Sequence, residues 1–225
     1  MAYYTKLPIV LLSELAAGKE DSNNCRISRY LLERLDCLED VSIEGLAGEC
    51  FVSKATISRF CRDIGLEDFS ELRGLLHQTE KTFTLYGQSL PPKEQGLDFC
   101  RRVNQSLRLA AETMDYGALE RLAGEIKEAK RAAAFGLLKA ETAAIILQSD
   151  LTMLGKNVVT KVAFREQMDY LSSAGSEDLV IIFSYTGIYF DYGLPRDVLR
   201  QGPRVWLGTG RPDIRERFKE KGLPV

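Results

Sequence analysis

The stretch SIEGLAGECFVSKATISRFCRDIG, residues 42–65, decides the fold of the N-terminal half of the chain. Ser42 and Ser53 each precede apolar residues spaced three and four apart, a pattern typical of a capped amphipathic helix. About three residues separate the two predicted helices, as in a helix-turn-helix motif. We therefore predict two short helices joined by a tight turn, with further short helices before and after them.

The second predicted helix has one apolar face and one face that suits a nucleic acid. The apolar face carries Ile57, Phe60, Cys61 and Ile64. No acidic residue occurs between Cys50 and Arg62, although residues 1–80 contain nine Lys and Arg against 14 Asp and Glu. A basic surface without acids suits a phosphate backbone, and the alternative is a solvated face on an ordinary helical bundle. The predicted DNA-contacting residues are Ser53, Lys54, Ala55, Thr56, Ser58, Arg59 and Arg62.

This region also resembles a known family. The run VSKATISRFCRDIGL (residues 52–66), followed by FSEL (residues 69–72), resembles the recognition-helix signature of the RpiR (MurR/RpiR) family of bacterial transcriptional regulators. The resemblance implies that residues 1–77 form a helix-turn-helix domain that binds double-stranded operator DNA. One departure is Phe51, which stands where the family usually has a glycine that tolerates a positive φ.

The second half of the chain alternates between helical and strand patterns. Leu179–Phe183 is a continuous apolar run, as expected for a strand buried on both faces of a parallel sheet. Three other short strands are predicted near Ala132, Val158 and Arg204. The repetition predicts an α/β fold with a doubly wound parallel sheet over residues 96–225, and residues 78–95 are predicted to be a linker.

The RpiR resemblance extends to this half, which looks like a SIS (sugar isomerase) domain that senses phosphosugars. By that resemblance about four strands are retained and the domain is C-terminally truncated, since the fifth strand would begin where the chain ends. Leu138 and Ala140 replace a glycine and a serine of the first phosphate loop, so weak or altered ligand binding is expected. The predicted ligand-binding residues are Gly136, Lys139, Ser184, Tyr185, Thr186 and Gly187.

The leading hypothesis is a regulator of sugar-metabolism genes that binds operator DNA as a homodimer or higher homo-oligomer and responds to a sugar phosphate. An SIS-type phosphosugar isomerase is the alternative. Glu141 and Glu166 are its candidate bases, and both have the pattern of solvated helix residues. A second alternative is a dimerisation scaffold that senses nothing. We expect a regulator rather than an enzyme.

Composition excludes several other classes. No apolar run is long enough to span a membrane, and the N-terminus lacks the pattern of a signal peptide, so a cytoplasmic protein is expected. The five cysteines show no C-x-x-C spacing and are expected to be core residues. With His77 as the single histidine, no metal site and no cofactor are predicted.

Overall fold

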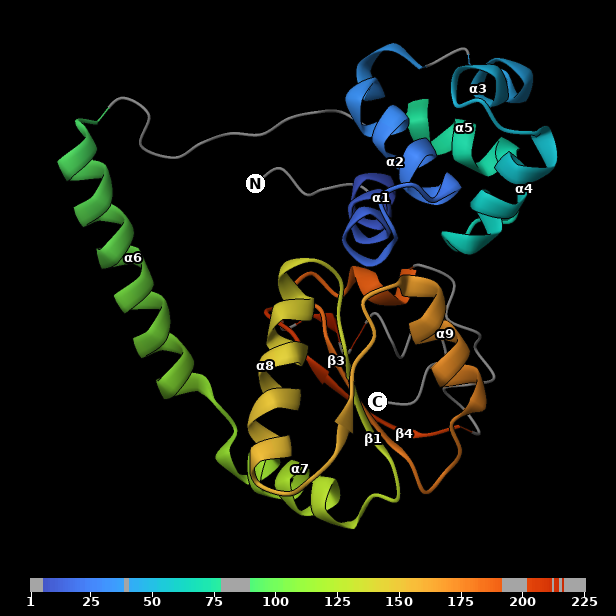
Figure 1. The fold of residues 1–225 in the computed structure, drawn as a ribbon. Coiled ribbons are helices and arrows are strands. Elements are labelled where there is room, and N and C mark those ends of the chain that lie inside the picture. Colours follow the sequence, from blue (N-terminus) through green and yellow to red (C-terminus); the bar gives the residue numbers. More distant parts are fainter. Residues whose placement is uncertain are drawn as a thin grey trace. The chain divides into compact units, whose positions relative to one another are not determined.

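The computed structural model describes residues 6–38, 41–77, 90–191, 202–211, 213, 214 and 216. They form helices and one parallel sheet (Figure 1). The chain divides into two compact units. The described part of one unit is residues 90–125, and the other unit holds the N-terminal helices and the sheet. Each unit is described by itself below.

The N-terminal helices form a small bundle, called the helical domain here (residues 6–77). Its elements are α1 (Lys6–Ala17), α2 (Asn23–Glu33), the 3-10 turn η1 (Leu35–Cys37), α3 (Ile43–Glu49), α4 (Lys54–Asp63) and α5 (Phe69–His77). The apolar stripes of these helices meet in one core, where Leu46, Ile57 and Phe60 are fully buried. The predicted helix-turn-helix pair is therefore present as α3 and α4.

The two predicted serine caps fix where α3 and α4 begin. The Oγ of Ser42 accepts a hydrogen bond from the backbone N–H of Gly45 at 3.0 Å. The Oγ of Ser53 accepts one from the N–H of Thr56 at 3.1 Å. Each cap satisfies a backbone donor that has no partner inside the helix, and such a cap typically stabilises a helix by about 1 kcal/mol.

The turn between α3 and α4 is a Schellman motif with an unusual residue at its left-handed position. The N–H of Val52 donates to the carbonyl of Ala47, and the N–H of Phe51 donates to the carbonyl of Gly48. Phe51 has a φ of 53°, and its side chain is 87% exposed. The turn therefore keeps the conformation that favours glycine, although a phenylalanine occupies it.

We expect Phe51→Gly to stabilise the helical domain by about 1 kcal/mol. A left-handed conformation costs an ordinary residue roughly 1–2 kcal/mol, and part of this gain is offset by the entropy of glycine in the unfolded chain. Little packing is lost because the ring is exposed. Urea titration measures the change. Gly65→Ala is the matched control at the end of α4, where φ is 80°, and it should be destabilising. A lower stability of Phe51→Gly would contradict this account.

The sheet is parallel and has the strand order β2-β1-β3-β4. Its elements are β1 (Ala132–Phe135), α8 (Lys139–Met153), β2 (Val158–Val159), α9 (Phe164–Ser173), β3 (Leu179–Phe183), the 3-10 turn η2 (Ile188–Asp191) and β4 (Arg204–Gly208). The first four residues of β3 and all of β1 are buried, as the apolar patterns predicted. The predicted fold class, a helical domain followed by an α/β domain with a four-stranded parallel sheet, is confirmed.

The remaining unit contains α6 (Pro92–Thr113) and most of α7 (Tyr116–Glu128). α6 begins at Pro92, which lies inside the linker predicted over residues 78–95. Residues 78–89 of that linker lie outside the described part of the chain. The domain boundaries stay predictions. The sequence pattern also predicts helices over residues 195–200 and 214–221. The first lies outside the described residues, and so does most of the second.

The prediction that all five cysteines belong to the core is wrong for two of them. Cys37 and Cys100 are exposed, whereas Cys25, Cys50 and Cys61 are buried. Cys37 lies in a short 3-10 turn, and Cys100 lies on a helix that buries no side chain. Burial raises the pKa of the Cys61 thiol to about 12, so this group stays protonated and unreactive near neutral pH.

Candidate DNA-binding and ligand-binding sites

The predicted DNA-contacting residues all lie on or directly before α4. The apolar face of this helix is buried through Ile57, Phe60 and Cys61, so the opposite face is turned outward. Its outward residues are Ser53, Lys54, Ala55, Arg59 and Arg62, which are exposed, with Thr56 and Ser58 half-buried. The structure thus brings these seven residues to one face of a capped helix.

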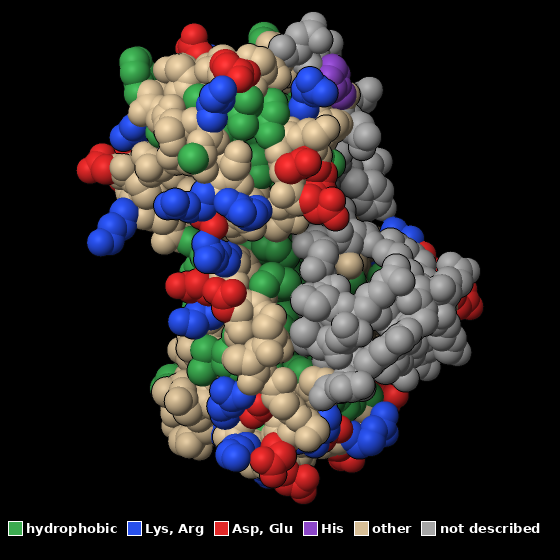
Figure 2. Space-filling model, turned by 90° about the vertical axis from the view of Figure 1, so that its right-hand side faces the viewer, with side chains coloured by type: hydrophobic (Ala, Val, Ile, Leu, Met, Phe, Trp, Pro, Cys, Tyr) green, Lys and Arg blue, Asp and Glu red, His purple; other side chains and the backbone are tan. Residues whose placement is uncertain are grey.

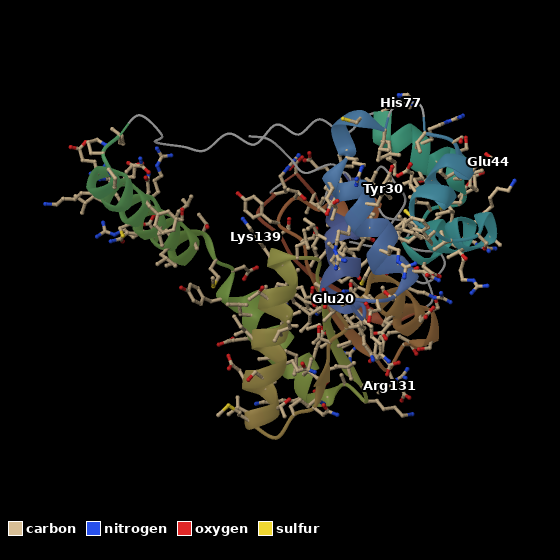
Figure 3. The ribbon with its side chains drawn as sticks, turned by 45° about the horizontal axis from the view of Figure 1, so that its top comes forward. Glu20, Tyr30, Glu44, His77, Arg131 and Lys139 are labelled. Atoms are coloured by element: carbon tan, nitrogen blue, oxygen red, sulfur yellow. The ribbon has the colours of Figure 1, made fainter. Side chains whose placement is uncertain are left out.

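The beginning of α4 offers groups that can bind a phosphate. The hydroxyl groups of Ser53 and Thr56 lie 2.9 Å apart at the first turn. Lys54 forms an ion pair with Glu44 at 2.9 Å (Glu44 is labelled in Figure 3). Both side chains are more than half exposed, and such a surface pair is worth little, so a phosphate can replace the carboxylate as partner of the ammonium group.

The end of α4 faces α9. Arg59, Arg62 and Asp63 line a groove of about 500 Å3 together with Phe164, Arg165, Met168 and Asp169. In Figure 2 a row of Lys and Arg side chains crosses this face of the unit, with Asp and Glu side chains just below. Asp63 pairs with Arg165 and accepts a hydrogen bond from Asn24 at 3.3 Å. The acidic end of α4 is thereby engaged inside the protein rather than presented on the predicted DNA-binding surface.

The first predicted ligand loop joins β1 to α8 and is tightly folded. A Cβ atom at Gly136 would lie 2.6 Å from the carbonyl carbon of Ala140, so only glycine fits there. Leu138 has a φ of 53°, and it holds the glycine-like conformation at the position where the family resemblance expects glycine. The backbone shape of the loop is therefore kept, while the isobutyl side chain occupies the space that a glycine would leave open.

The start of α8 offers fewer free donors than a typical anion site at a helix N-terminus. The N–H groups of Ala140 and Glu141 donate to the carbonyls of Leu137 and Leu138 at 3.2 and 3.1 Å. Lys139 is exposed at this end of α8 (Figure 3) and supplies a cation. Because the amides are already hydrogen-bonded, an anion here would depend more on Lys139 than on the backbone.

The second predicted ligand loop follows β3. Ser184 is buried, and its Oγ accepts a hydrogen bond from the N–H of Tyr189 at 3.2 Å. Gly187, with a φ of 72°, donates its N–H to the carbonyl of Ser184 at 3.0 Å. Thr186 is half-buried, and Tyr185 is 64% exposed. The loop is thus held by its own hydrogen bonds. Among the described residues the Ser184 hydroxyl has no acceptor for its own proton, so it can donate to a ligand.

Two residues that the sequence did not single out as site residues connect the two loops. Gln167 of α9 is fully buried, and its amide donates to the carbonyls of Gly136 at 2.8 Å and Lys161 at 2.7 Å. The buried Tyr189 hydroxyl donates to the Gln167 side-chain carbonyl at 2.7 Å. Burial raises the pKa of this phenol, so it remains a donor. The resulting chain of hydrogen bonds runs from Ser184 through Tyr189 and Gln167 to Gly136.

Glu141 is not the solvated residue that its sequence pattern indicated. It lies in the first turn of α8 and is 6% exposed. Its Oε1 is buried without a hydrogen-bond partner among the described residues. Desolvation raises the pKa of this carboxyl to about 7. The prediction failed because tertiary packing, which the local spacing does not encode, buries the side chain. Glu166, by contrast, is exposed as predicted.

Other kinds of site find no support in the part of the chain that the structure describes. Its His, Cys, Asp and Glu residues form no group of three that could hold a metal ion. None of its helices is both long and apolar enough to cross a lipid bilayer.

A pair of capped helices joined by a tight turn, the second with Lys54, Arg59 and Arg62 on its outward face, defines a helix-turn-helix protein. Comparison with known families agrees with this class. Residues 14–82 match the model of the helix-turn-helix domain of the rpiR family.

Several curated relatives are named as transcriptional regulators. An uncharacterised HTH-type transcriptional regulator of Providencia stuartii is 26% identical over 169 residues, which cover 72% of this chain and 60% of the relative. The HTH-type transcriptional regulator HexR of Pseudomonas aeruginosa is 23% identical, with 79% of this chain and 65% of the relative covered. An uncharacterised HTH-type transcriptional regulator of Caldanaerobacter subterraneus is 39% identical over 78 residues, which cover 32% of this chain and 27% of the relative. The chain therefore spans less than two thirds of these relatives.

A solved structure resembles the chain more distantly. The Vibrio vulnificus NanR protein complexed with ManNAc-6P covers 91% of this chain and 74% of its own, with 19% sequence identity and a TM-score of 0.42.

Proposed function

We propose that the protein is a transcriptional regulator of sugar-metabolism genes that binds double-stranded operator DNA through α4 and is not an enzyme. The observation that carries the proposal is the outward face of α4, where Arg59 and Arg62 share one surface with the capped, hydroxyl-bearing first turn. Arginine can reach guanine edges or phosphates, and the first turn can hold a phosphate. The match of residues 14–82 to the rpiR-family helix-turn-helix domain and the names of the relatives support the same role.

The proposal extends to a homodimer in the cytoplasm. A single helix-turn-helix contacts only a few base pairs, and two copies on a symmetric operator supply the affinity that one lacks. The acidic composition of residues 1–80 adds to this need, because general attraction of the domain to DNA is weak.

Arg59→Ala and Arg62→Ala are each expected to weaken operator binding by about 1–3 kcal/mol, which is roughly 5- to 150-fold in Kd. Both side chains point away from the apolar core, so the thermal stability should hardly change. Mobility-shift titration on the operator at several salt concentrations measures both the affinity and its salt dependence. If the arginine contacts a phosphate, its removal should reduce the slope of log affinity against log salt concentration by about one. If it contacts a base, its removal should instead relax the sequence specificity of binding.

Arg73→Ala provides the matched control for these substitutions. Arg73 is an exposed arginine on α5 of the same domain, outside the acid-free window. Its removal lowers the net charge of the protein by the same amount but should leave operator affinity within about twofold. Equal losses of operator affinity in all three variants would show that only the overall charge of the domain matters. They would also show that α4 does not make the specific contacts with the operator.

The proposed effector is a sugar phosphate held between the β1–α8 loop and the loop after β3. The candidate contacts are Gly136, Lys139, Ser184, Tyr185, Thr186 and Gly187, of which Ser184 and Lys139 supply a hydroxyl donor and a cation. Binding is proposed to be weak, because the amides at the start of α8 are engaged and Tyr189 and Phe190 are buried beside the second loop.

Hexose, pentose and amino-sugar phosphates at millimolar concentration should each raise the Tm by no more than about 1–2 °C. A ligand present near its Kd stabilises the folded state by less than about 1 kcal/mol. Differential scanning fluorimetry measures the shift, and the unphosphorylated sugar is the control. A shift of many degrees with one sugar phosphate, lost in Lys139→Ala, would show an intact high-affinity site and contradict the expectation of weak binding.

A further inference from the structure

The helix α6 is amphipathic over its whole length and buries none of its side chains. Leu97 is 57% exposed, Phe99 68% and Leu107 66%. An apolar helix face normally packs against something, because packing supplies most of the stability of a helix in a protein. The apolar face of α6 therefore has no partner within the described residues of its own unit, 90–125.

The apolar positions of α6 repeat with alternating spacings of four and three residues. These positions are Gly96, Cys100, Val103, Leu107, Ala110 and Met114, called the α6 seam here. This is the heptad spacing with which one helix packs along another. The residues flanking the seam are also uncharged: Leu97, Phe99, Asn104, Ser106, Ala111 and Thr113.

Every charged residue between Gly96 and Met114 lies on the other face of the helix. Asp98 forms ion pairs there with Arg101 at 3.3 Å and Arg102 at 2.6 Å. An uncharged seam repels no second copy of itself, whereas like charges facing each other across a two-fold axis would do so. We propose that the α6 seam binds the α6 seam of a second copy of this chain, in antiparallel orientation. The proposal refines the homodimer of the proposed function.

The antiparallel orientation follows from the sizes of the side chains. In an antiparallel pair centred on residue 105, Gly96 faces Met114, Cys100 faces Ala110 and Val103 faces Leu107 of the second copy. Each large residue meets a smaller one, as close packing requires. A parallel pair would instead place glycine opposite glycine and alanine opposite alanine, which leaves voids.

The same arrangement supplies enough area. Five large apolar side chains of α6 are 42–68% exposed, namely Leu97, Phe99, Val103, Leu107 and Leu109, and all but Leu109 lie on this face. Four such side chains with Met114 can bury roughly 500 Å2 on each copy, which reaches the total of about 1,000 Å2 that a specific interface needs.

Sedimentation of the full chain with and without a charge in the seam tests the proposal. The unmodified protein should be a dimer at micromolar concentration, and Leu107→Lys should raise the dimer Kd at least 100-fold. Leu109→Lys is the matched control, because Leu109 is equally exposed but lies outside the seam. Circular dichroism should show the same helix content in all three proteins. A dimer that survives Leu107→Lys overturns the proposal, and so does an unmodified monomer.

Disulfide trapping tests the orientation. In a Cys37→Ser background the only exposed cysteine among the described residues is Cys100. Adding Ala110→Cys should give rapid intermolecular cross-linking under mild oxidation, because the two positions face each other in the antiparallel pair. The background protein alone should cross-link slowly. Rapid cross-linking through Cys100 alone indicates a parallel pair and overturns the antiparallel arrangement.

Mobility shift with the same variants separates this proposal from the proposed function. If operator binding depends on Arg59 and Arg62 but the protein is a monomer, the α6 pairing is wrong and the DNA-binding role stands. If the protein is a dimer that Leu107→Lys dissociates, yet the operator is not bound at all, the DNA-binding role is wrong and the pairing stands.

Discussion

Phe60→Ala is expected to lower the free energy of unfolding of the helical domain by about 3–5 kcal/mol. Phe60 is fully buried and is among the largest fully buried side chains of the protein. Removing its ring leaves a cavity between α4 and the rest of the bundle. Because 3–5 kcal/mol is a large share of the stability of a small domain, operator binding should fall with it. Urea titration followed by circular dichroism measures the change.

Phe51→Ala is the matched control for this prediction. It removes the same ring from the same domain, but the ring of Phe51 is 87% exposed, and its φ remains positive after the substitution. It should change the stability by less than about 1 kcal/mol, as surface substitutions usually do. Similar losses for the two variants would mean that Phe60 is not part of a packed core.

Glu141 is expected to make the α/β domain less stable as the pH rises from 5 to 8. Its carboxyl has a pKa of about 7 in the folded protein against an ordinary value of 4.5. Between these two values the folded state binds more protons than the unfolded state, so stability falls with rising pH and levels off above about 7. The full effect is on the order of 1–3 kcal/mol.

Glu141→Gln should remove this part of the pH dependence, because the amide does not titrate. The difference between the Tm values at pH 5 and pH 8 should shrink in this variant. Glu166→Gln is the control, since that carboxylate is exposed and its removal should leave the pH profile unchanged. An unaltered profile in Glu141→Gln would show that the carboxyl is solvated in the folded protein.

The helical domain was largely predictable because its signals are local. Serine caps, three- and four-residue spacings and a short turn each act within one or two helical turns, and Ser42 and Ser53 cap the predicted helices. The strands were found for a similar reason, since Leu179–Phe183 is a continuous apolar run. The change from glycine to Phe51 does not alter the turn, because Phe51 keeps the positive φ that the family resemblance places there.

The ligand site could not be predicted in the same detail because its contacts join distant segments. Gln167 and Tyr189 are separated by 22 residues, and Gln167 and Gly136 by 31, yet hydrogen bonds connect them. No local spacing encodes such contacts. The burial of Glu141 and the exposure of Cys100 were missed for the same reason, because tertiary packing decides both.

The strand order has a consequence for the chain as it is synthesised. β3 lies between β1 and β4, and β4 begins 21 residues after β3 ends. Until β4 emerges from the ribosome, the apolar run Leu179–Phe183 can pair on one edge only. Open edges of such β-prone segments favour aggregation, so slow translation between these two strands would lower the yield of folded protein.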